Sequence, residues 1–174
     1  FNINYQAAFD LGDPEELIGQ HKILREGLQL FEQTFGYKAS YFVPPNGPFN
    51  NELEKTASEE GIKFMSCSKI QNEVLGNGRT RKKMHFLGQK NKSNQTYITR
   101  NCFFEPSQEG KDWVASCLND MEIAFRWFKP AVISSHRVNY IGGLNEENRQ
   151  KGLQQLETLV NKALVKWPNL EFMT

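Results

Sequence analysis

Short apolar runs alternate with helical patterns along the first part of this chain, and this order restricts its fold more than any other feature. Asp13 is a favourable helix N-cap, and the apolar residues that follow recur at helical spacing as far as Gly36. The predicted elements are a helix over 13–36, a strand over 41–43, a helix over 50–60 and a strand over 62–65. Because the connections are short, the order favours parallel βα units and an α/β fold.

The middle of the chain interrupts this alternation. The segments 85–87 and 96–99 are predicted to be two strands around a polar turn, which would insert a β-hairpin. The basic run over 79–83 favours a solvated loop over a nucleic-acid patch, because no aromatic residues are interleaved with it. The other predicted elements are an edge strand or docked loop over 1–9, a helix that Asp112 caps, a buried strand over 131–133, a helix over 146–166 and a final strand over 170–173.

Length and composition restrict the partners. The 174 residues suit one domain, and 21 Lys and Arg stand against 20 Asp and Glu. This balance predicts no general attraction to nucleic acid, and no apolar run approaches the roughly 20 residues of a membrane span. The three cysteines are widely spaced, which argues against a disulfide framework or a cysteine zinc site. Because the chain begins at Phe1, we expect residues 1–174 to be an N-terminally incomplete single domain.

Polar residues follow three of the predicted strands. Asn46 follows the strand over 41–43, Arg100 follows the strand over 96–99, and the strand over 131–133 leads into His136, Arg137 and Asn139. The carboxyl ends of parallel strands meet at one edge of a sheet, so we expect these side chains to converge on a pocket there. Amide and guanidinium groups in a pocket suit ligands rich in hydroxyl or acyl oxygens.

His136 is the residue of this group that can transfer protons near neutral pH. Arg137, or an amide near it, could stabilise an oxyanion. The alternative interpretation is that His136 is an ordinary loop histidine with satisfied hydrogen bonds. His21 lies on an apolar helical stripe and is predicted to pack there. A closed metal site from this chain alone would require His21, His85 and His136 to meet, and their wide separation in the sequence argues against it.

Two motifs resemble those of the polysaccharide deacetylase family, the NodB-like carbohydrate esterases. Ala-Val-Ile-Ser-Ser-His136 resembles the hydrophobic strand that ends in the family's last histidine, and Tyr-Phe-Val-Pro-Pro-Asn-Gly47 resembles its Arg-x-Pro-Tyr-Gly motif. Arg-Asn-Cys-Phe-Phe-Glu-Pro106 and Ser-His-Arg-Val-Asn-Tyr140 look like a bacterial branch of that superfamily. The resemblance implies that the chain is part of a distorted (β/α) barrel.

The resemblance also implies a function, the metal-dependent removal of acetyl groups from a carbohydrate. His136 would protonate the leaving group, while Asn46, Arg100, Arg137 and Asn139 would bind substrate oxygens. The implied cofactor is a divalent metal such as zinc. The family's Asp-Asp motif and paired histidines are absent from this chain, so the metal ligands are expected upstream of Phe1.

Two other functions remain open at this stage. The first is a non-catalytic carbohydrate-binding domain on the same scaffold. The second is a glycosidase on a related barrel, which requires two carboxylates that flank the scissile bond. Glu105 is the only carboxylate that the pattern places at a strand end, which makes the glycosidase the weaker of the two.

Overall fold

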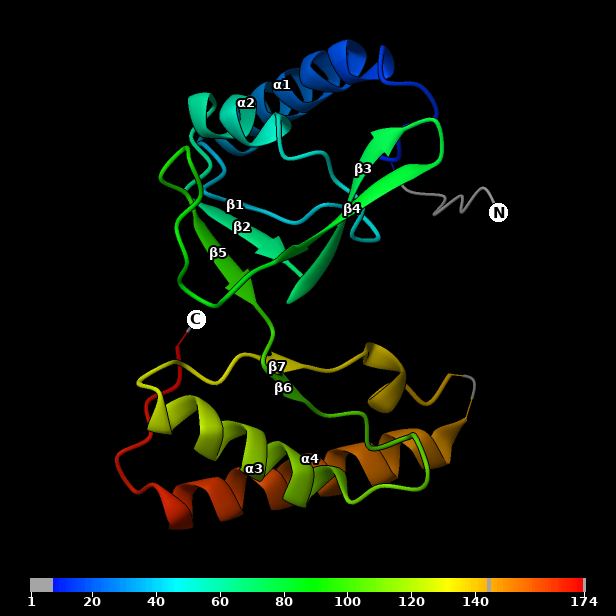
Figure 1. Cartoon of the computed structure of the whole chain (residues 1–174). Coiled ribbons are helices and arrows are strands. Elements are labelled where there is room, and N and C mark those ends of the chain that lie inside the picture. The colour runs from blue at the N-terminus through cyan, green and yellow to red at the C-terminus, as the bar shows by residue number, and fades with distance from the viewer. Residues whose placement is uncertain (1–7, 144, 174) are drawn as a thin grey trace. The chain divides into compact units, whose positions relative to one another are not determined.

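The computed structural model describes residues 8–143 and 145–173, so most of the segment predicted as an edge strand or docked loop over 1–9 lies outside it. The chain divides into two units, Phe1–Thr99 and Arg100–Thr174, and each is described by itself (Figure 1). The single domain expected over residues 1–174 stays a prediction.

The first unit contains a three-stranded parallel sheet with the strand order β1-β2-β5. Tyr41 pairs with Phe64 at the start of the sheet, and Phe64 pairs with Thr96 on the other side. The elements are α1 (Glu16–Phe35), β1 (Tyr41–Phe42), α2 (Leu53–Glu59), β2 (Phe64–Cys67) and β5 (Thr96–Thr99). The parallel βα order that the sequence predicts is therefore confirmed for this unit.

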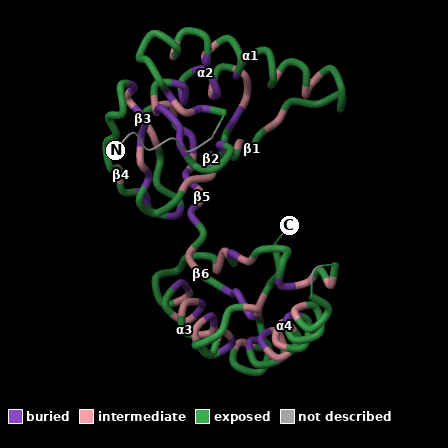
Figure 2. Tube along the Cα trace, turned by 90° about the vertical axis from the view of Figure 1, so that its right-hand side faces the viewer, coloured by how far each residue is buried: buried purple, intermediate pink, exposed green. Residues whose placement is uncertain are grey.

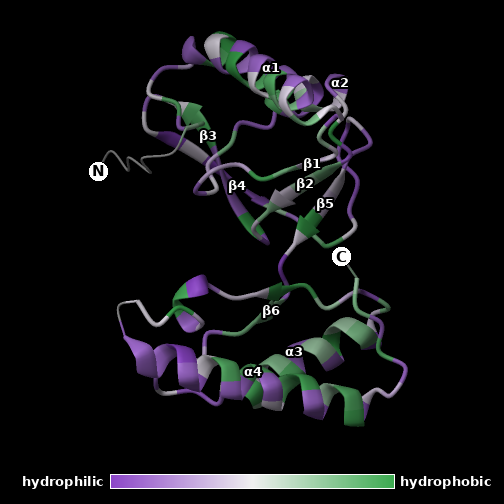
Figure 3. Ribbon diagram, turned by 180° about the vertical axis from the view of Figure 1, so that it is seen from behind, coloured by the Kyte–Doolittle hydropathy of each residue, from purple (hydrophilic) through white to green (hydrophobic). Residues whose placement is uncertain are grey.

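Apolar side chains from both helices and the sheet form the core of the first unit. Leu24 of α1, Leu53 of α2 and Met65 of β2 are all buried in one cluster (Figure 2). Helix α1 carries both hydrophobic and hydrophilic residues (Figure 3), and Leu17, Leu24 and Leu28, which recur at helical spacing, pack in or against the core, as in an amphipathic helix. Gly36 ends α1 at φ 76°, a left-handed conformation in which its N–H donates to the carbonyl of Glu32.

The hairpin of the first unit lies before the predicted one. It consists of β3 (Ile70–Gly76) and β4 (Arg79–Met84), which are antiparallel. Asn77 and Gly78 both have positive φ, 54° and 68°, which is typical of a tight hairpin turn. The prediction for 85–87 was wrong, and the segment 96–99 is β5, whose main partner is β2 in a parallel pairing.

The basic run over 79–83 is thus most of β4, not a solvated loop. Its pairing is supported by Glu73 on β3, whose side chain is only 2% exposed. Arg81 and Lys83 place their charged ends 2.6 and 3.2 Å from the Glu73 carboxylate. A strand that is held by cross-strand ion pairs lacks the apolar alternation on which the sequence prediction depended.

The second unit packs two helices against a pair of short parallel strands. Its elements are β6 (Cys102–Phe103), α3 (Trp113–Arg126), β7 (Ile133–Ser134), the 3₁₀ helix η1 (Arg137–Asn139) and α4 (Glu146–Lys166). Asp112 caps α3 as predicted, because its Oδ1 accepts from the N–H of Ala115 at 2.9 Å. The core contains Phe104, Cys117 and Leu159, all nearly inaccessible to solvent.

Two predictions for the second unit were wrong. The segment 170–173 forms no strand; the Leu170 N–H donates to the carbonyl of Trp167 in a turn. The strand over 131–133 is predicted to be buried on both faces, but β7 is two residues long and Ile133 is 44% exposed. Among the described residues of the second unit β7 pairs with β6 alone, so it is not enclosed as a central strand would be.

The fold class is mixed α/β with parallel strands. Within residues 8–143 and 145–173 the strands form sheets of three, two and two members, and none of these closes into a barrel. The finer assignment to a NodB-like barrel stays a prediction. No helix in the described part of the chain is long and apolar enough to cross a membrane.

Candidate functional site

The two parallel strands of the second unit bring Glu105 and His136 side by side. Cys102 pairs with Ile133 and Phe103 with Ser134, and the Phe104 N–H continues the pairing with a 2.9 Å bond to the Ser134 carbonyl. Glu105 lies two residues after the end of β6, and His136 lies two residues after the end of β7. In-register strands that end together therefore place these two side chains at the same edge.

The histidine and the carboxylate form a hydrogen-bonded pair. Nδ1 of His136 lies 2.7 Å from Oε1 of Glu105, and the backbone N–H of His136 donates to Oε2 at 3.3 Å. An ionised carboxylate only accepts hydrogen bonds, so Nδ1 carries the proton, and Nε2 is the nitrogen with the free lone pair. Within the described residues Nε2 has no hydrogen-bond partner, and the His136 side chain is 72% exposed against 8% for Glu105.

Asn139 positions the carboxylate from within the protein. Its Nδ2 lies 2.7 Å from Oε2 of Glu105 and also donates to the His136 carbonyl at 2.7 Å. Its Oδ1 accepts from the backbone N–H and the hydroxyl of Ser107, at 3.0 and 2.7 Å. Asn139 is completely buried and both ends of its amide are occupied, so the prediction that it binds substrate oxygens is replaced by a positioning role.

Ser135 and Tyr140 lie beside this network. Their hydroxyl oxygens are 2.8 Å apart, and Ser135 Oγ also accepts from Nδ2 of Asn139 at 3.2 Å. Burial raises the pKa of Tyr140, and the hydrogen bond with Ser135 opposes this rise only in part. The Tyr140 phenol is therefore neutral at neutral pH and serves as a hydrogen-bonding group.

The two predicted arginines lie in the second unit with His136. Arg100 is exposed and its Nη1 donates to Oγ of Ser134 at 3.3 Å, which ties it to the strand that leads to His136. Arg137 begins η1 directly after His136, and its side chain is exposed. Asn46 belongs to the first unit, where it lies in a turn at φ 55°. The predicted convergence of Asn46 with the other candidates thus stays a prediction.

The other two histidines have structural partners in the first unit. Nδ1 of His21 lies 2.7 Å from Oγ1 of Thr56, and Nε2 of His85 lies 2.6 Å from Oε1 of Gln71. Across the described residues no three His, Cys, Asp or Glu side chains come together as a metal site. The divalent metal expected from the resemblance therefore stays a prediction, and we derive no chemical step from it.

The sequence pattern gave Glu105 only as a lone carboxylate and gave Ser107 no role. Glu105 and His136 follow β6 and β7 by the same number of residues, but these strand bounds come from the structure and were not predicted from the sequence. Comparisons with models of protein families, with curated proteins and with solved structures found no match to this chain.

This arrangement is suited to proton transfer at an exposed atom. The buried carboxylate fixes the ring orientation and the tautomer of His136, and it would stabilise the positive charge of a protonated ring. The exposed guanidinium groups of Arg100 and Arg137 add positive charge to the same unit. A water molecule that approached Nε2 would meet a proton acceptor on a rigid support, and the ring, once protonated there, could pass the proton to a leaving group.

Proposed function

We propose that the protein is a hydrolase in which His136 acts as the general acid and base. The observation that supports this proposal is the pair formed by the exposed His136 ring and the buried Glu105 carboxylate, 2.7 Å apart. The substrate class comes from the resemblance of the Ala-Val-Ile-Ser-Ser-His136 motif, and it is an acetylated carbohydrate.

In the proposed reaction Nε2 of His136 accepts a proton from water while the water oxygen attacks the acetyl carbonyl. The bond from the carbonyl carbon to the sugar nitrogen or oxygen then breaks, and the leaving atom takes that proton from Nε2. Glu105 holds the Nδ1 proton throughout and stabilises the charged ring. Arg137 is placed to bind a carbonyl or sugar oxygen, since it is exposed and adjacent to His136. The divalent metal of the resembling family would supply a Lewis acid, and the described residues contain no group of three or more His, Cys, Asp or Glu side chains that could hold it.

The geometry favours this reaction over the glycosidase alternative. Both oxygens of Glu105 are engaged, one by the ring of His136 and the other by Asn139. A glycosidase needs one carboxylic acid and a second carboxylate on either side of the scissile bond. In the described part of the second unit no other carboxylate contacts the His136–Glu105 pair.

The test is acetate release from acetylated oligosaccharides by the natural full-length protein. His136→Gln keeps a side-chain amide that can bond to Glu105 but cannot transfer protons, so turnover should fall by about 10²- to 10⁴-fold. Glu105→Gln removes the charge that supports the ring and should lower turnover as well, whereas Glu109→Gln, an exposed glutamate in the same loop, should not.

Two results would contradict the proposal. Unchanged turnover in His136→Gln would remove the histidine from the reaction. Oligosaccharide binding without acetate release, equal in the native protein and in His136→Gln, would favour the non-catalytic carbohydrate-binding domain instead. Circular dichroism of each variant would show that a loss of turnover is not a loss of folding.

A further inference from the structure

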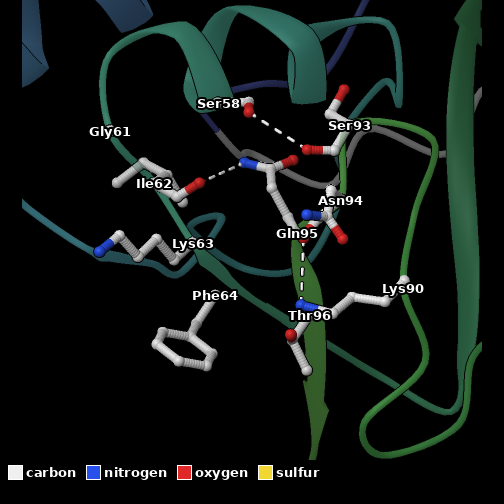
Figure 4. Close-up of a pocket in the computed structure, with 10 residues that line it drawn as sticks. All are labelled: Ser58, Gly61, Ile62, Lys63, Phe64, Lys90, Ser93, Asn94, Gln95 and Thr96. Atoms are coloured by element: carbon white, nitrogen blue, oxygen red, sulfur yellow. Dashed lines mark hydrogen bonds between the residues drawn. The ribbon is translucent and has the colours of Figure 1, made fainter.

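The first unit contains a second place for a ligand, a cavity of about 410 Å³ where α2 ends and where β2 and β5 begin (Figure 4). Ligand pockets in proteins typically have about 300–1,000 Å³, so this cavity has room for one monosaccharide. It lies at the amino ends of β2 and β5, since Phe64 and Thr96 are the first residues of these strands. All its described lining residues belong to the first unit, and neither His136 nor Glu105 is one of them.

Hydrogen bonds between the walls fix the shape of the cavity. Ser58 Oγ donates to the Ser93 carbonyl at 3.3 Å, and Nε2 of Gln95 donates to the Ile62 carbonyl at 2.9 Å. Gln95 is 1% exposed, so this second bond is protected from water. The first bond joins the loop before β5 to the last turn of α2, and the second joins that loop to the segment that follows α2 (Figure 4). A cavity with walls joined in this way is largely formed before a ligand binds, which lowers the entropic cost of binding.

The charge of the lining is positive. Lys63 and Lys90 contribute to the walls, and no aspartate or glutamate is among the described residues that line the cavity. Nζ of Lys90 donates to the Asn94 carbonyl at 3.1 Å, so its charge lies among the lining residues, while the Lys63 side chain points away from Lys90 (Figure 4). The acidic residues at the end of α2, Glu59 and Glu60, face Arg25, at 3.7 and 3.1 Å.

The remaining lining offers neutral polar groups and one aromatic ring. Ser93, Asn94 and Thr96 provide hydroxyl and amide groups that can both donate and accept, as sugar hydroxyls require. The ring of Phe64 is at the edge of the cavity and is 40% exposed (Figure 4). An apolar ring of this kind suits the C–H face of a sugar. No arginine is among the described lining residues. The positive charge therefore comes from lysine ammonium groups, which lack the planar pair of N–H donors with which a guanidinium group binds both oxygens of an anion.

We propose that this cavity binds a single sugar unit that carries a negative charge, either a carboxylate or a phosphate. The Lys90 ammonium group would hold the anion, and the hydroxyl and amide groups would hold the ring hydroxyls. This site goes beyond the proposed hydrolase function, because it lies in the other unit and needs neither His136 nor Glu105.

The test is calorimetric titration of the natural full-length protein with glucuronate, glucose 6-phosphate, glucose and inorganic phosphate. A charged sugar should bind roughly tenfold or more tightly than glucose and than inorganic phosphate, because both the charge and the hydroxyls contribute. Preference for glucuronate or for glucose 6-phosphate identifies the carboxylate or the phosphate as the anion, and either supports the proposal. Added salt should weaken binding.

Lys90→Met should weaken binding of the charged sugar by roughly tenfold. Lys82→Met is the matched control, because Lys82 is an exposed lysine of the same unit that does not line the cavity. Equal binding of glucose and glucuronate, equal binding of phosphate with and without the sugar, equal effects of the two variants, or no binding of any probe would each overturn the proposal. Acetate release by the Lys90→Met protein should be unchanged, so this test is independent of the hydrolase test.

Discussion

Gly152 of α4 lies against the backbone of η1, and replacing it by alanine tests the link between packing and the candidate site. A Cβ atom at Gly152 would overlap the carbonyl oxygen of Asn139 and reach its carbonyl carbon at 2.8 Å. Backbone atoms cannot turn away as a flexible side chain can, so η1 or α4 must shift. The movement would pass to the Asn139 side chain and hence to the Glu105 carboxylate that it holds.

Two opposing effects determine how far Gly152→Ala changes the free energy of unfolding. Alanine in a helix interior is more stable than glycine by about 0.5–1 kcal/mol. Forcing an extra methyl group into a closely packed contact costs about 1–3 kcal/mol. The contact should prevail at Gly152, with a net loss of roughly 0–2 kcal/mol in the free energy of unfolding. Gly27 of α1 is the matched control, because nothing lies within 4 Å of a Cβ placed there. Gly27→Ala should therefore stabilise the protein by about 0.5–1 kcal/mol.

The assay is hydrogen exchange of backbone amides in each unit, together with urea unfolding. Gly152→Ala should speed exchange in the second unit and leave the first unit unchanged, while Gly27→Ala should slow exchange in α1. Acetate release should fall in Gly152→Ala, since a displacement of about 1 Å in a reacting group can cost about 100-fold in rate. If Gly152→Ala stabilised the protein as much as Gly27→Ala does, the close contact between α4 and η1 would be refuted.

The remaining predictions concern two buried carboxyl groups of the first unit. Burial alone raises the pKa of Glu73, but hydrogen bonds from Arg81 and Lys83 outweigh it and leave the pKa lowered. Glu73 therefore stabilises the folded state above its unfolded pKa, and this stabilisation is lost as pH falls through the pKa of Glu73 in the folded protein. Between pH 6 and pH 3 the urea midpoint should accordingly fall less in Glu73→Gln than in the native protein. Burial raises the pKa of Glu54, and the hydrogen bond from Tyr97 only partly offsets this. Because the ionised form of Glu54 destabilises the fold, the free energy of unfolding should decline as pH rises through the range in which carboxyl groups ionise. A Glu54→Gln protein that kept this decline would contradict the reasoning.

The helices were predictable because their signals are local. Asp112 caps α3 through a bond to a backbone N–H three residues later, and Gly36 ends α1 within one turn. The hairpin was harder, since β4 consists mostly of polar residues whose place depends on Glu73 across the strand pair. The turn residues Asn77 and Gly78 carry a local hairpin signal, but a search for apolar alternation on either side misses it.

The candidate site was predictable only in part, because some of its contacts join residues that are far apart in the sequence. His136 could be found because a short apolar run leads into it, whereas the role of Glu105 depends on the pairing of β6 with β7, about thirty positions apart in the chain. Asn139 was assigned to substrate because a polar residue after a strand is ordinarily exposed. The 3₁₀ turn of η1 instead buries its amide against Glu105, and the sequence carries no periodic pattern that predicts such a turn.

The same pairing explains why the histidine is both exposed and well oriented. An exposed imidazole normally samples several rotamers, and a fully buried one cannot reach a substrate. Here the orienting atoms all come from the protein side of the ring. Glu105 bonds to Nδ1, and Asn139 holds Glu105 while Ser107 holds Asn139. Each partner in this chain is more buried than His136 itself, so the rigidity comes from the core of the second unit while Nε2 remains open to solvent.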